Sequence, residues 1–160
     1  MFYDDDDEDD EDDYYNRSGD VKNLPIFKKG EEIRDVVSLL ADLFPEDDEQ
    51  LQFLKDEMLS NAHLLTVKIV GAEATELYDL KMEAATFIRK AACDLMVMNH
   101  SLAAFGFENV DYFQIVRQLI EEYRLLFIDW VAGFDKWSYI IDRWGLFNPP
   151  GIGPFDYPEF

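Results

Sequence analysis

The chain has 160 residues, enough for one domain with a single core, and 48% of them are hydrophobic, which argues against a disordered body. Its 35 acidic residues outnumber its 14 lysines and arginines and give a formal net charge of −21. Because nucleic-acid affinity depends on basic side chains that displace counterions, this charge argues against direct nucleic-acid binding. It opposes binding to anionic membrane surfaces as well.

The N-terminal region contains one unbroken run of acidic residues, Asp4–Asp13. Like charges at this density cannot pack together, so we expect residues 1–25 to form an acidic, disordered tail. Removing the ten acids of the run from the total of 35 leaves 25 acids against 14 bases, a net charge of −11 for the rest of the chain. The run either only keeps the protein in solution or binds a basic partner, as a docking arm or as a mimic of a phosphate backbone.

The chain shows no targeting signal that we can identify. Its first residues lack the basic and apolar regions of a signal peptide, and no stretch reaches the ~18 uninterrupted apolar residues of a membrane span, so we expect a cytoplasmic location without membrane contact. Cys93 is the only cysteine, which excludes an intrachain disulfide. Its neighbours Ala91 and Ala92 predict that Cys93 is buried as a small apolar side chain, with a reactive thiol as the alternative.

The first predicted helix covers about residues 30–44. Apolar residues recur there at steps of three and four, which defines one helical face. Glu31 and Glu32 fall in the expected first turn, where the helix dipole favours anions, and Pro45 is expected to end the helix. The apolar face consists of Ile33, Val36, Val37, Leu40 and Leu43.

Two longer helices are predicted next. One opens on Pro45 and four acidic residues, a composition suited to a helix start, and ends near residues 71–74. The other covers about residues 75–105, and Gly106 is expected to cap it in the left-handed conformation. The apolar face of the first of these helices is Leu51, Leu54, Met58, Ala62, Leu65, Ile69 and Ala72. The apolar face of the second is Leu77, Leu80, Ala84, Ile88, Ala91, Leu95, Met98, Leu102 and Phe105.

The fourth predicted helix begins near Asn109 or Asp111 and continues to about Trp144, because the apolar spacing persists across Gly133. At a rise of about 1.5 Å per residue it would be about 50 Å long. Gly145 is expected to end it. Its apolar face is Tyr112, Val116, Leu119, Tyr123, Phe127, Trp130, Phe134, Trp137, Ile141 and Trp144.

Four amphipathic helices with short connections predict an all-α fold: an antiparallel up-and-down four-helix bundle over residues 26–145, with a long fourth helix. Residues 146–160 are rich in proline, glycine and aromatic side chains, a composition that excludes a helix. We expect the first part of this C-terminal extension to pack along the bundle or a neighbouring subunit. The alternative is an extension that is only partly ordered.

The sequence contains no pattern that defines an active site. A di-iron site in a four-helix bundle needs Glu-x-x-His pairs, and neither His63 nor His100 has a glutamate three positions before it. We therefore expect no metal ligands, no cofactor and no catalytic residues, with both histidines at helix edges or in structural hydrogen bonds. Acid pairs at helical spacing, such as Asp79 and Glu83, are interpreted as a solvated helix face.

The most distinctive pattern is a repeated triplet of an acid, a base and a tryptophan, which ends first at Trp137 and again at Trp144. On the predicted helix the two tryptophans would share one face, where they either complete the core or anchor a partner. If the fourth helix overhangs its companions, self-association or the C-terminal extension is needed to cover them. The candidate surface for a partner or for self-association is Trp137, Trp144, Phe147, Phe155 and Tyr157.

The helix lengths and a few motifs resemble the four-helix-bundle proteins encoded in intervening sequences of large-subunit ribosomal RNA genes. The first helix is short and ends at Phe44-Pro45, and the second closes with Ile69-Val70-Gly71-Ala72-Glu73-Ala74, which is similar to that family's Asn-Ile-Ala-Glu-Gly ending. A third helix rich in small residues and an amphipathic fourth helix follow. The likeness covers about residues 27–132.

This resemblance implies a non-enzymatic up-and-down bundle that assembles into ring-like oligomers such as pentamers. Related bundles partner a reverse transcriptase and nucleic acid through a basic surface. Here the Gln-Arg-Arg character of the family's second helix is replaced by Lys55-Asp56-Glu57 and Ser60-Asn61. This departure, together with the negative charge, argues against an RNA-binding role.

Three functional hypotheses follow. The first is a non-catalytic interaction or assembly module that forms a homo-oligomer or contacts a basic partner protein. The second is a nucleic-acid-associated accessory protein, or phosphate-backbone mimic, that binds a basic protein. The third is an enzyme with a hidden carboxylate site, which only the surplus of acids suggests.

Overall fold

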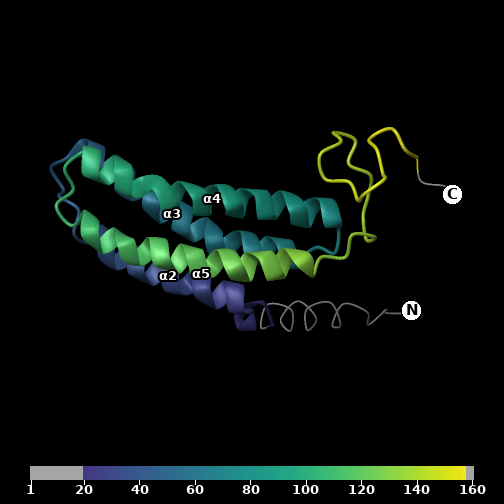
Figure 1. Cartoon of the computed structure of the whole chain (residues 1–160), viewed down its shortest axis with the longest axis horizontal. Coiled ribbons are helices and arrows are strands. Elements are labelled where there is room, and N and C mark those ends of the chain that lie inside the picture. The colour runs from purple at the N-terminus through teal and green to yellow at the C-terminus, as the bar shows by residue number, and fades with distance from the viewer. Residues whose placement is uncertain (1–19, 158–160) are drawn as a thin grey trace, which may run out of the picture.

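The computed structural model describes residues 20–157, and this part of the chain is all-helical, without a β-strand (Figure 1). The elements are α2 (Pro25–Ala41), α3 (Glu49–Glu73), α4 (Tyr78–Ala104), the short 3-10 helix η1 (Val110–Tyr112) and α5 (Phe113–Ala132). Residues 20–23 are also helical, and Val21 is buried, so the predicted tail does not extend to residue 25. The acidic run itself lies outside the described residues.

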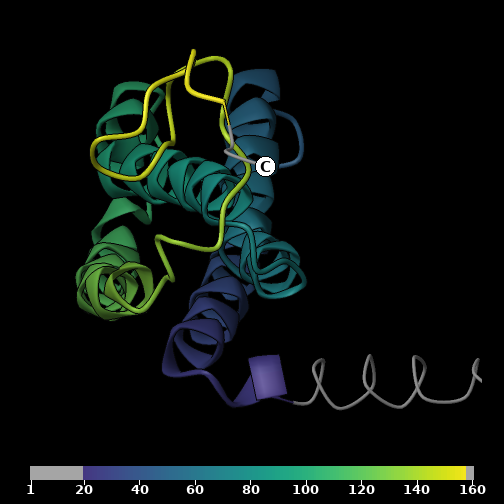
Figure 2. The ribbon, with the colours of Figure 1, turned by 90° about the vertical axis from the view of Figure 1, so that its right-hand side faces the viewer.

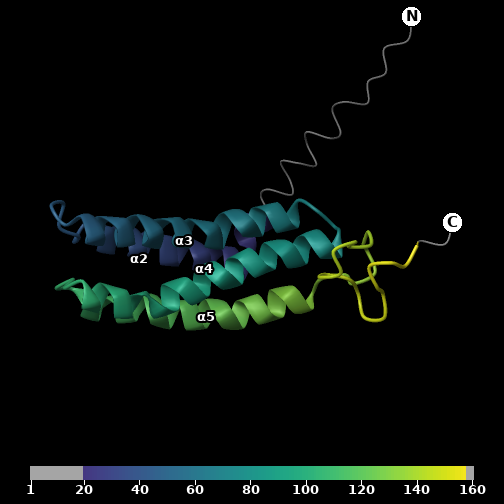
Figure 3. The same cartoon turned by 90° about the horizontal axis from the view of Figure 1, so that it is seen from above.

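The helices α2, α3, α4 and α5 lie side by side, and successive helices run in opposite directions (Figures 1 and 3). Each packs against the next along the chain, and α5 returns to pack against α2, so the four helices enclose one common core. We call residues 25–132 the helical body. No helix in residues 20–157 is both long and apolar enough to cross a membrane.

The first helix differs from its prediction at both ends. It begins at Pro25 rather than Gly30 and ends at Ala41 rather than Phe44. Proline is favoured in a first turn because it lacks an N–H and its φ angle already fits a helix. Pro45 therefore lies in the turn before α3 and does not itself end α2.

The second and third helices end close to their predicted ends but begin later than predicted, at Glu49 rather than Pro45 and at Tyr78 rather than residue 75. At the start of α3, the Asp48 carboxylate accepts a hydrogen bond from the backbone N–H of Leu51 at 3.0 Å, which is an N-cap. At the end of α4, Gly106 has a φ angle of +78°, the left-handed conformation expected of the cap.

The prediction for the fourth helix is wrong at its C-terminal end. α5 ends at Ala132, and the N–H of Gly133 donates to the carbonyl of Trp130 at 3.2 Å. With 20 residues, α5 is shorter than α3 with 25 and α4 with 27, so there is no long fourth helix that overhangs its companions. Trp137 and Trp144 consequently lie in turns and do not share a helical face.

The core consists of the inner faces of the four helices. Every residue predicted for the inner face of α3 is buried, which confirms that assignment. The prediction for α4 holds from Ile88 to Leu102. Leu80 and Phe105 are half-exposed at the two ends, and Ala84 is only partly buried. The buried residues of α4 are Ala85, Ile88, Ala91, Leu95, Met98 and Leu102.

The predicted burial of Cys93 is wrong, because this cysteine is exposed. The buried face of α4 passes from Ala91 to Leu95, and a residue midway between two buried positions on a helix points to the other side. The apolar neighbours of Cys93 thus reflect the composition of α4 and not the direction of its side chain.

The helices α2 and α5 both meet α3 at a single turn. A Cβ atom on Gly30 would lie 2.9 Å from Cγ2 of Thr66 and 3.1 Å from the carbonyl oxygen of Leu65, so only glycine allows this approach of α2. From α5, the buried Tyr123 hydroxyl donates to the same Leu65 carbonyl at 2.8 Å. Burial raises the pKa of Tyr123, because a phenolate would be desolvated there.

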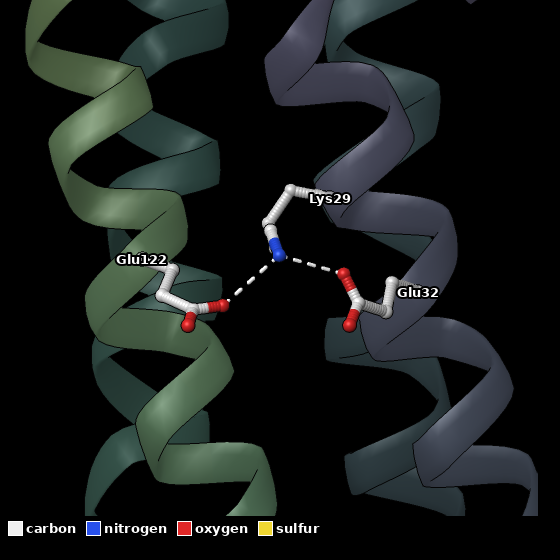
Figure 4. A network of polar contacts seen from close by, with 3 residues as sticks. All are labelled: Lys29, Glu32 and Glu122. Carbon is white, nitrogen blue, oxygen red and sulfur yellow. Dashed lines mark hydrogen bonds and ion pairs between the residues drawn. The ribbon is translucent and has the colours of Figure 1, made fainter.

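An ion-pair network links α2 and α5 on the surface (Figure 4). Nζ of Lys29 lies 2.7 Å from Glu32 on α2 and 2.9 Å from Glu122 on α5. The hydrogen bond to Glu32, followed by that to Glu122, raises the pKa of Lys29. Exposed pairs of this kind contribute at most about 1 kcal/mol, so the network adjusts the packing of α2 on α5 more than it stabilises the fold.

Candidate partner-binding surface

Residues 133–157, which we call the C-terminal segment, form irregular loops at the end of the helical body where α4 begins and α5 ends (Figures 1 and 2). Two contacts attach the segment to the helices. The N–H of Tyr78, the first residue of α4, donates to the carbonyl of Ser138 at 2.7 Å. The buried Phe134 packs edge-on against Trp130, with ring centroids 4.8 Å apart.

Asp142 determines the conformation of the segment beyond this point. Its Oδ1 accepts a hydrogen bond from the N–H of Trp144 at 2.9 Å, and its Oδ2 accepts from the N–H groups of Leu146 and Phe147, each at 2.9 Å. The side chain of Asn148 bonds to the backbone N–H and carbonyl of Asp142, at 2.7 and 2.9 Å. We call residues 142–148 the Asp142 loop.

These hydrogen bonds also affect the ionisation of Asp142. The N–H groups of Phe147, Leu146 and Trp144, in decreasing order of effect, stabilise the carboxylate and lower its pKa below the usual range of aspartate. The group therefore stays negatively charged at acidic pH values where other aspartates begin to protonate.

The repeated acid-base-tryptophan triplet is a turn motif and not a helical face. In the first copy, Oδ1 of Asp135 accepts from the N–H of Trp137 at 3.0 Å, as Asp142 does from Trp144 in the second. An aspartate that accepts from the backbone two residues onward forms an Asx turn. Each tryptophan therefore follows a fixed turn, and its side chain is directed away from the core.

Four of the five residues of the predicted surface are strongly exposed, and the fifth, Phe147, is half-buried. The exposed fractions are 70% for Trp137, 95% for Trp144, 87% for Phe155 and 88% for Tyr157. Part of the segment packs: Pro149 is buried, and Phe147 lines a hollow against α4. The expectation that the extension packs along the bundle is not met by the four exposed aromatic side chains, and the segment lies beyond the ends of the helices (Figures 1 and 3).

A hollow of about 340 Å³, the acidic-aromatic hollow, separates the Asp142 loop from the start of α4. Asp79 and Glu83, which the spacing placed on a solvated face, both line it. Oδ1 of Asp79 is buried and accepts no hydrogen bond from residues 20–157, so the interpretation as a solvated face is wrong for this residue. The lining consists of Asp79, Glu83, Thr86, Phe87, Asp142, Trp144, Leu146 and Phe147.

A second hollow of about 590 Å³, the Lys81 hollow, lies between the ends of α3 and α5 and the start of α4. It also combines acidic and aromatic side chains, but Lys81 lines it. Nζ of Lys81 lies 5.2 Å from the centre of the Phe134 ring and donates to the carbonyl of Ala72 at 2.9 Å. The other lining residues are Glu73, Glu76, Asp129, Trp130, Gly133, Asp135 and Ser138.

Both histidines are exposed on their helices, and neither side chain forms a hydrogen bond within the described part of the chain. In the same residues, no three histidine, cysteine, aspartate or glutamate side chains converge as a metal site requires. Comparison of the chain with protein-family models, curated proteins and solved structures finds no match.

The sequence interpretation missed the role of Asp142. The signal was present, since Asp142 precedes Gly145, Asn148 and Pro149, a combination typical of turns. The proximity of Asp79 to Trp144 had no such signal, because the two come from segments far apart in the chain that meet only after folding.

Proposed function

We propose that this chain is a non-catalytic interaction module whose C-terminal segment binds a basic partner protein. The observation that carries the proposal is the exposure of Trp137, Trp144, Phe155 and Tyr157. The two tryptophans lie in turns whose backbone N–H groups are held by Asp135 and Asp142. Exposed aromatic side chains on a fixed backbone are characteristic of binding hot spots, since little conformational entropy is lost when they are covered.

The charge of the chain supports a basic partner. Residues 20–157 contain 24 of the 35 acids and 13 of the 14 bases, a net charge of −11. Asp79, Glu83 and Asp142 line the same hollow as Trp144. A complementary basic surface would speed association and favour this partner over acidic ones.

The architecture of the helical body supports a more specific assignment. The alternating directions and the contacts of α2, α3, α4 and α5 agree with an up-and-down four-helix bundle. We propose this class for the helical body and, from the sequence resemblance, a relationship to the bundle proteins of ribosomal RNA intervening sequences. The cytoplasm remains the compartment that we propose for the protein.

Selection of peptides from a random display library on the immobilised chain tests the binding function. We expect the selected peptides to combine basic and apolar residues, because the surface combines carboxylates with aromatic rings. Substitution Trp144→Ala or Trp137→Ala should weaken a selected peptide at least about tenfold, since interface tryptophans often contribute 2 kcal/mol or more. Isothermal titration calorimetry with the purified peptide measures this loss.

Phe53→Ala provides the matched control, because Phe53 is another exposed aromatic residue, at 68%, but lies on α3 outside the C-terminal segment. Purely basic peptides whose binding depends on residues 4–13 would instead favour the alternative function, a mimic of a phosphate backbone. A selected peptide that binds equally well to the wild type, to the two tryptophan variants and to a chain without residues 4–13 would reject both functions.

We also propose that the chain self-associates, through the face formed by α4 and α5. A hollow of about 390 Å³ lies between these helices, and most of its lining is apolar. Arg89 and Arg124 at this hollow offset nearby acids, so repulsion between two copies is weaker here than on the rest of an acidic surface. The apolar lining residues are Ile88, Ala92, Met96, Ile120, Phe127 and Ile128.

Size-exclusion chromatography with light scattering at micromolar concentration measures this assembly. We expect a mass that is a multiple of the 18.7 kDa chain, and we expect Ile128→Glu to convert the oligomer to a monomer by placing a charge in the apolar hollow. The exposed Leu39 of α2 offers the control substitution Leu39→Glu, which should leave the mass unchanged. A monomeric wild type would overturn the self-association proposal without affecting the peptide experiment.

A further inference from the structure

We propose that the acidic-aromatic hollow is a binding site for the cationic head of an arginine or lysine side chain. The inference rests on the proposed function, because it names the chemical group through which a basic partner is recognised. Three independent features of the hollow support it: its carboxylates, its aromatic surface and its contrast with the Lys81 hollow.

The carboxylates approach the hollow from two sides. Asp79 and Glu83 are one turn apart on α4, and Asp142 faces them from the Asp142 loop. None of these acids forms an ion pair with a lysine or arginine of residues 20–157. Like charges that share one hollow repel each other, and a cation between them removes that repulsion.

Asp79 in particular lacks a hydrogen-bond donor. Its Oδ1 is buried and unpartnered among the described residues, a condition that costs free energy because the oxygen has lost its water without gaining a protein donor. A guanidinium or ammonium group that entered the hollow would offer N–H donors to the Asp79 carboxylate, which lines it.

Aromatic rings form the rest of the site. Trp144 is 95% exposed and lines the hollow together with Phe87 and Phe147, and cations are attracted to the faces of such rings. Nζ of Lys68 lies 4.8 Å from the centre of the Phe87 ring, so this ring already contacts a cation of the chain itself. The uncovered Trp144 ring is therefore the surface available to a cation from a partner.

The Lys81 hollow is a comparison within the same molecule, because acidic and aromatic side chains there surround a cationic one. It has acids and aromatic rings as well, and there the chain places its own cation, Lys81, next to Phe134. The acidic-aromatic hollow has no lysine or arginine in its lining, and Lys68 reaches only its Phe87 ring. The cation for its carboxylates and for Trp144 therefore comes from outside the chain.

Titration of the full chain with three small compounds, followed by two-dimensional NMR, tests the site. The compounds are N-acetyl-arginine amide, N-acetyl-lysine amide and N-acetyl-citrulline amide, the last of which has the shape of arginine without its charge. We expect the two cations to shift the indole N–H of Trp144 and the amides of Leu146 and Phe147, and the neutral compound to leave them unchanged. Arginine should bind more tightly than lysine, because its planar group can pair with a carboxylate through two hydrogen bonds.

The double variant Asp79→Asn and Glu83→Gln should bind the arginine compound at least about fivefold more weakly, since it preserves shape and removes two charges. Glu108→Gln, a change of one exposed acid at the turn after α4, is the control and should bind as the wild type does. Equal shifts with citrulline, shifts centred on the Lys81 hollow, or no shift at all would overturn the proposal. The titrations of the wild-type chain with the three compounds test the proposal even if the double variant does not fold.

The same variants separate this inference from the function on which it rests. Peptides from the display library that lose binding to Trp137→Ala and Trp144→Ala but keep it with the Asp79 and Glu83 variant would leave the interaction module intact and reject the cation site. Failure to select any peptide would reject the proposed function, whatever the small compounds do.

Discussion

Substitution of Asp142 by alanine should release the Asp142 loop without unfolding the helices. The side chain accepts hydrogen bonds from Trp144, Leu146 and Phe147, and all of them are lost together in Asp142→Ala. Amide hydrogen exchange measured by NMR should show at least about tenfold faster exchange for these N–H groups, since each becomes free to exchange from an unfolded loop. Binding of display-selected peptides should disappear, because the exposed tryptophan loses its fixed position.

Asp156→Ala is the matched control for this experiment. Its carboxylate also caps a turn of the C-terminal segment, but it accepts from the single N–H of Gly153, at 2.7 Å. We expect this change to affect residues near Gly153 and to leave the amides of the Asp142 loop protected. Unchanged exchange in Asp142→Ala would show that packing, for example of the buried Pro149, holds the loop instead.

The pH dependence of the same amides gives an independent check. The pKa of Asp142 is lowered in the folded state, so the stability that its ionisation gives to the loop is fully present above the pKa of a free aspartate. It is lost as the pH falls through the lower, folded-state pKa. Protection of the N–H groups of Leu146 and Phe147 should therefore persist when exposed aspartates have begun to protonate, and disappear only below that point.

The second large effect is expected at Gly30, where Gly30→Ala should destabilise the protein by up to about 2 kcal/mol. The new methyl group would meet Thr66 at 2.9 Å and the backbone of Leu65 at 3.1 Å, and the buried Thr66 has little room to move. Overpacking of this kind costs about 1–3 kcal/mol. The gain of about 1 kcal/mol from replacing glycine inside a helix offsets only part of that cost.

Gly71→Ala is the control, with the opposite expected sign. Gly71 also lies inside a helix, α3, but a Cβ atom there would contact nothing within 4 Å. This substitution should raise the free energy of unfolding by about 0.5–1 kcal/mol through helix propensity alone. Urea titrations of both variants measure the difference. Equal effects at the two glycines would mean that α2 does not approach α3 as closely as the structure shows.

Sequence periodicity predicted the helices of the body well wherever it coincided with end signals. α3 has both an uninterrupted apolar face and a capping residue, Asp48. Its C-terminal end and buried side were predicted correctly, and its start lies at Glu49 and not at Pro45. α4 has the face and the terminal glycine, Gly106, and only its ends were assigned imprecisely. The apolar spacing and the capping residues of a helix are local features, so they can be recognised from the sequence of that helix alone.

The error at the end of α5 has a physical reason. Apolar residues continue at steps of three and four from Phe134 through Trp137 to Trp144, but only the first of them is buried. Spacing alone cannot distinguish a helical face from turns that happen to repeat with the same period. Aspartates that accept from the backbone two residues onward compete with the helix, and at Asp135 and Asp142 they prevail.

The candidate site was predictable only in part. Trp137, Trp144, Phe155 and Tyr157 are exposed, as a binding surface requires, although the sequence placed the two tryptophans on a helix. The hollow between Asp79 and Trp144 was beyond prediction, since it depends on how the C-terminal segment folds back on the start of α4. Such contacts between distant segments are fixed by packing and not by local pattern.

The direction of α2 has a consequence for the acidic run. α2 begins at the end of the helical body where α5 finishes, and the C-terminal segment leaves the body at the same end (Figure 1). If the acidic run also binds a basic partner, a long basic stretch docked on the exposed tryptophans could engage two weak sites on one chain at high effective concentration. Such a ligand would gain avidity from two weak attachments, and short peptides would forgo that gain.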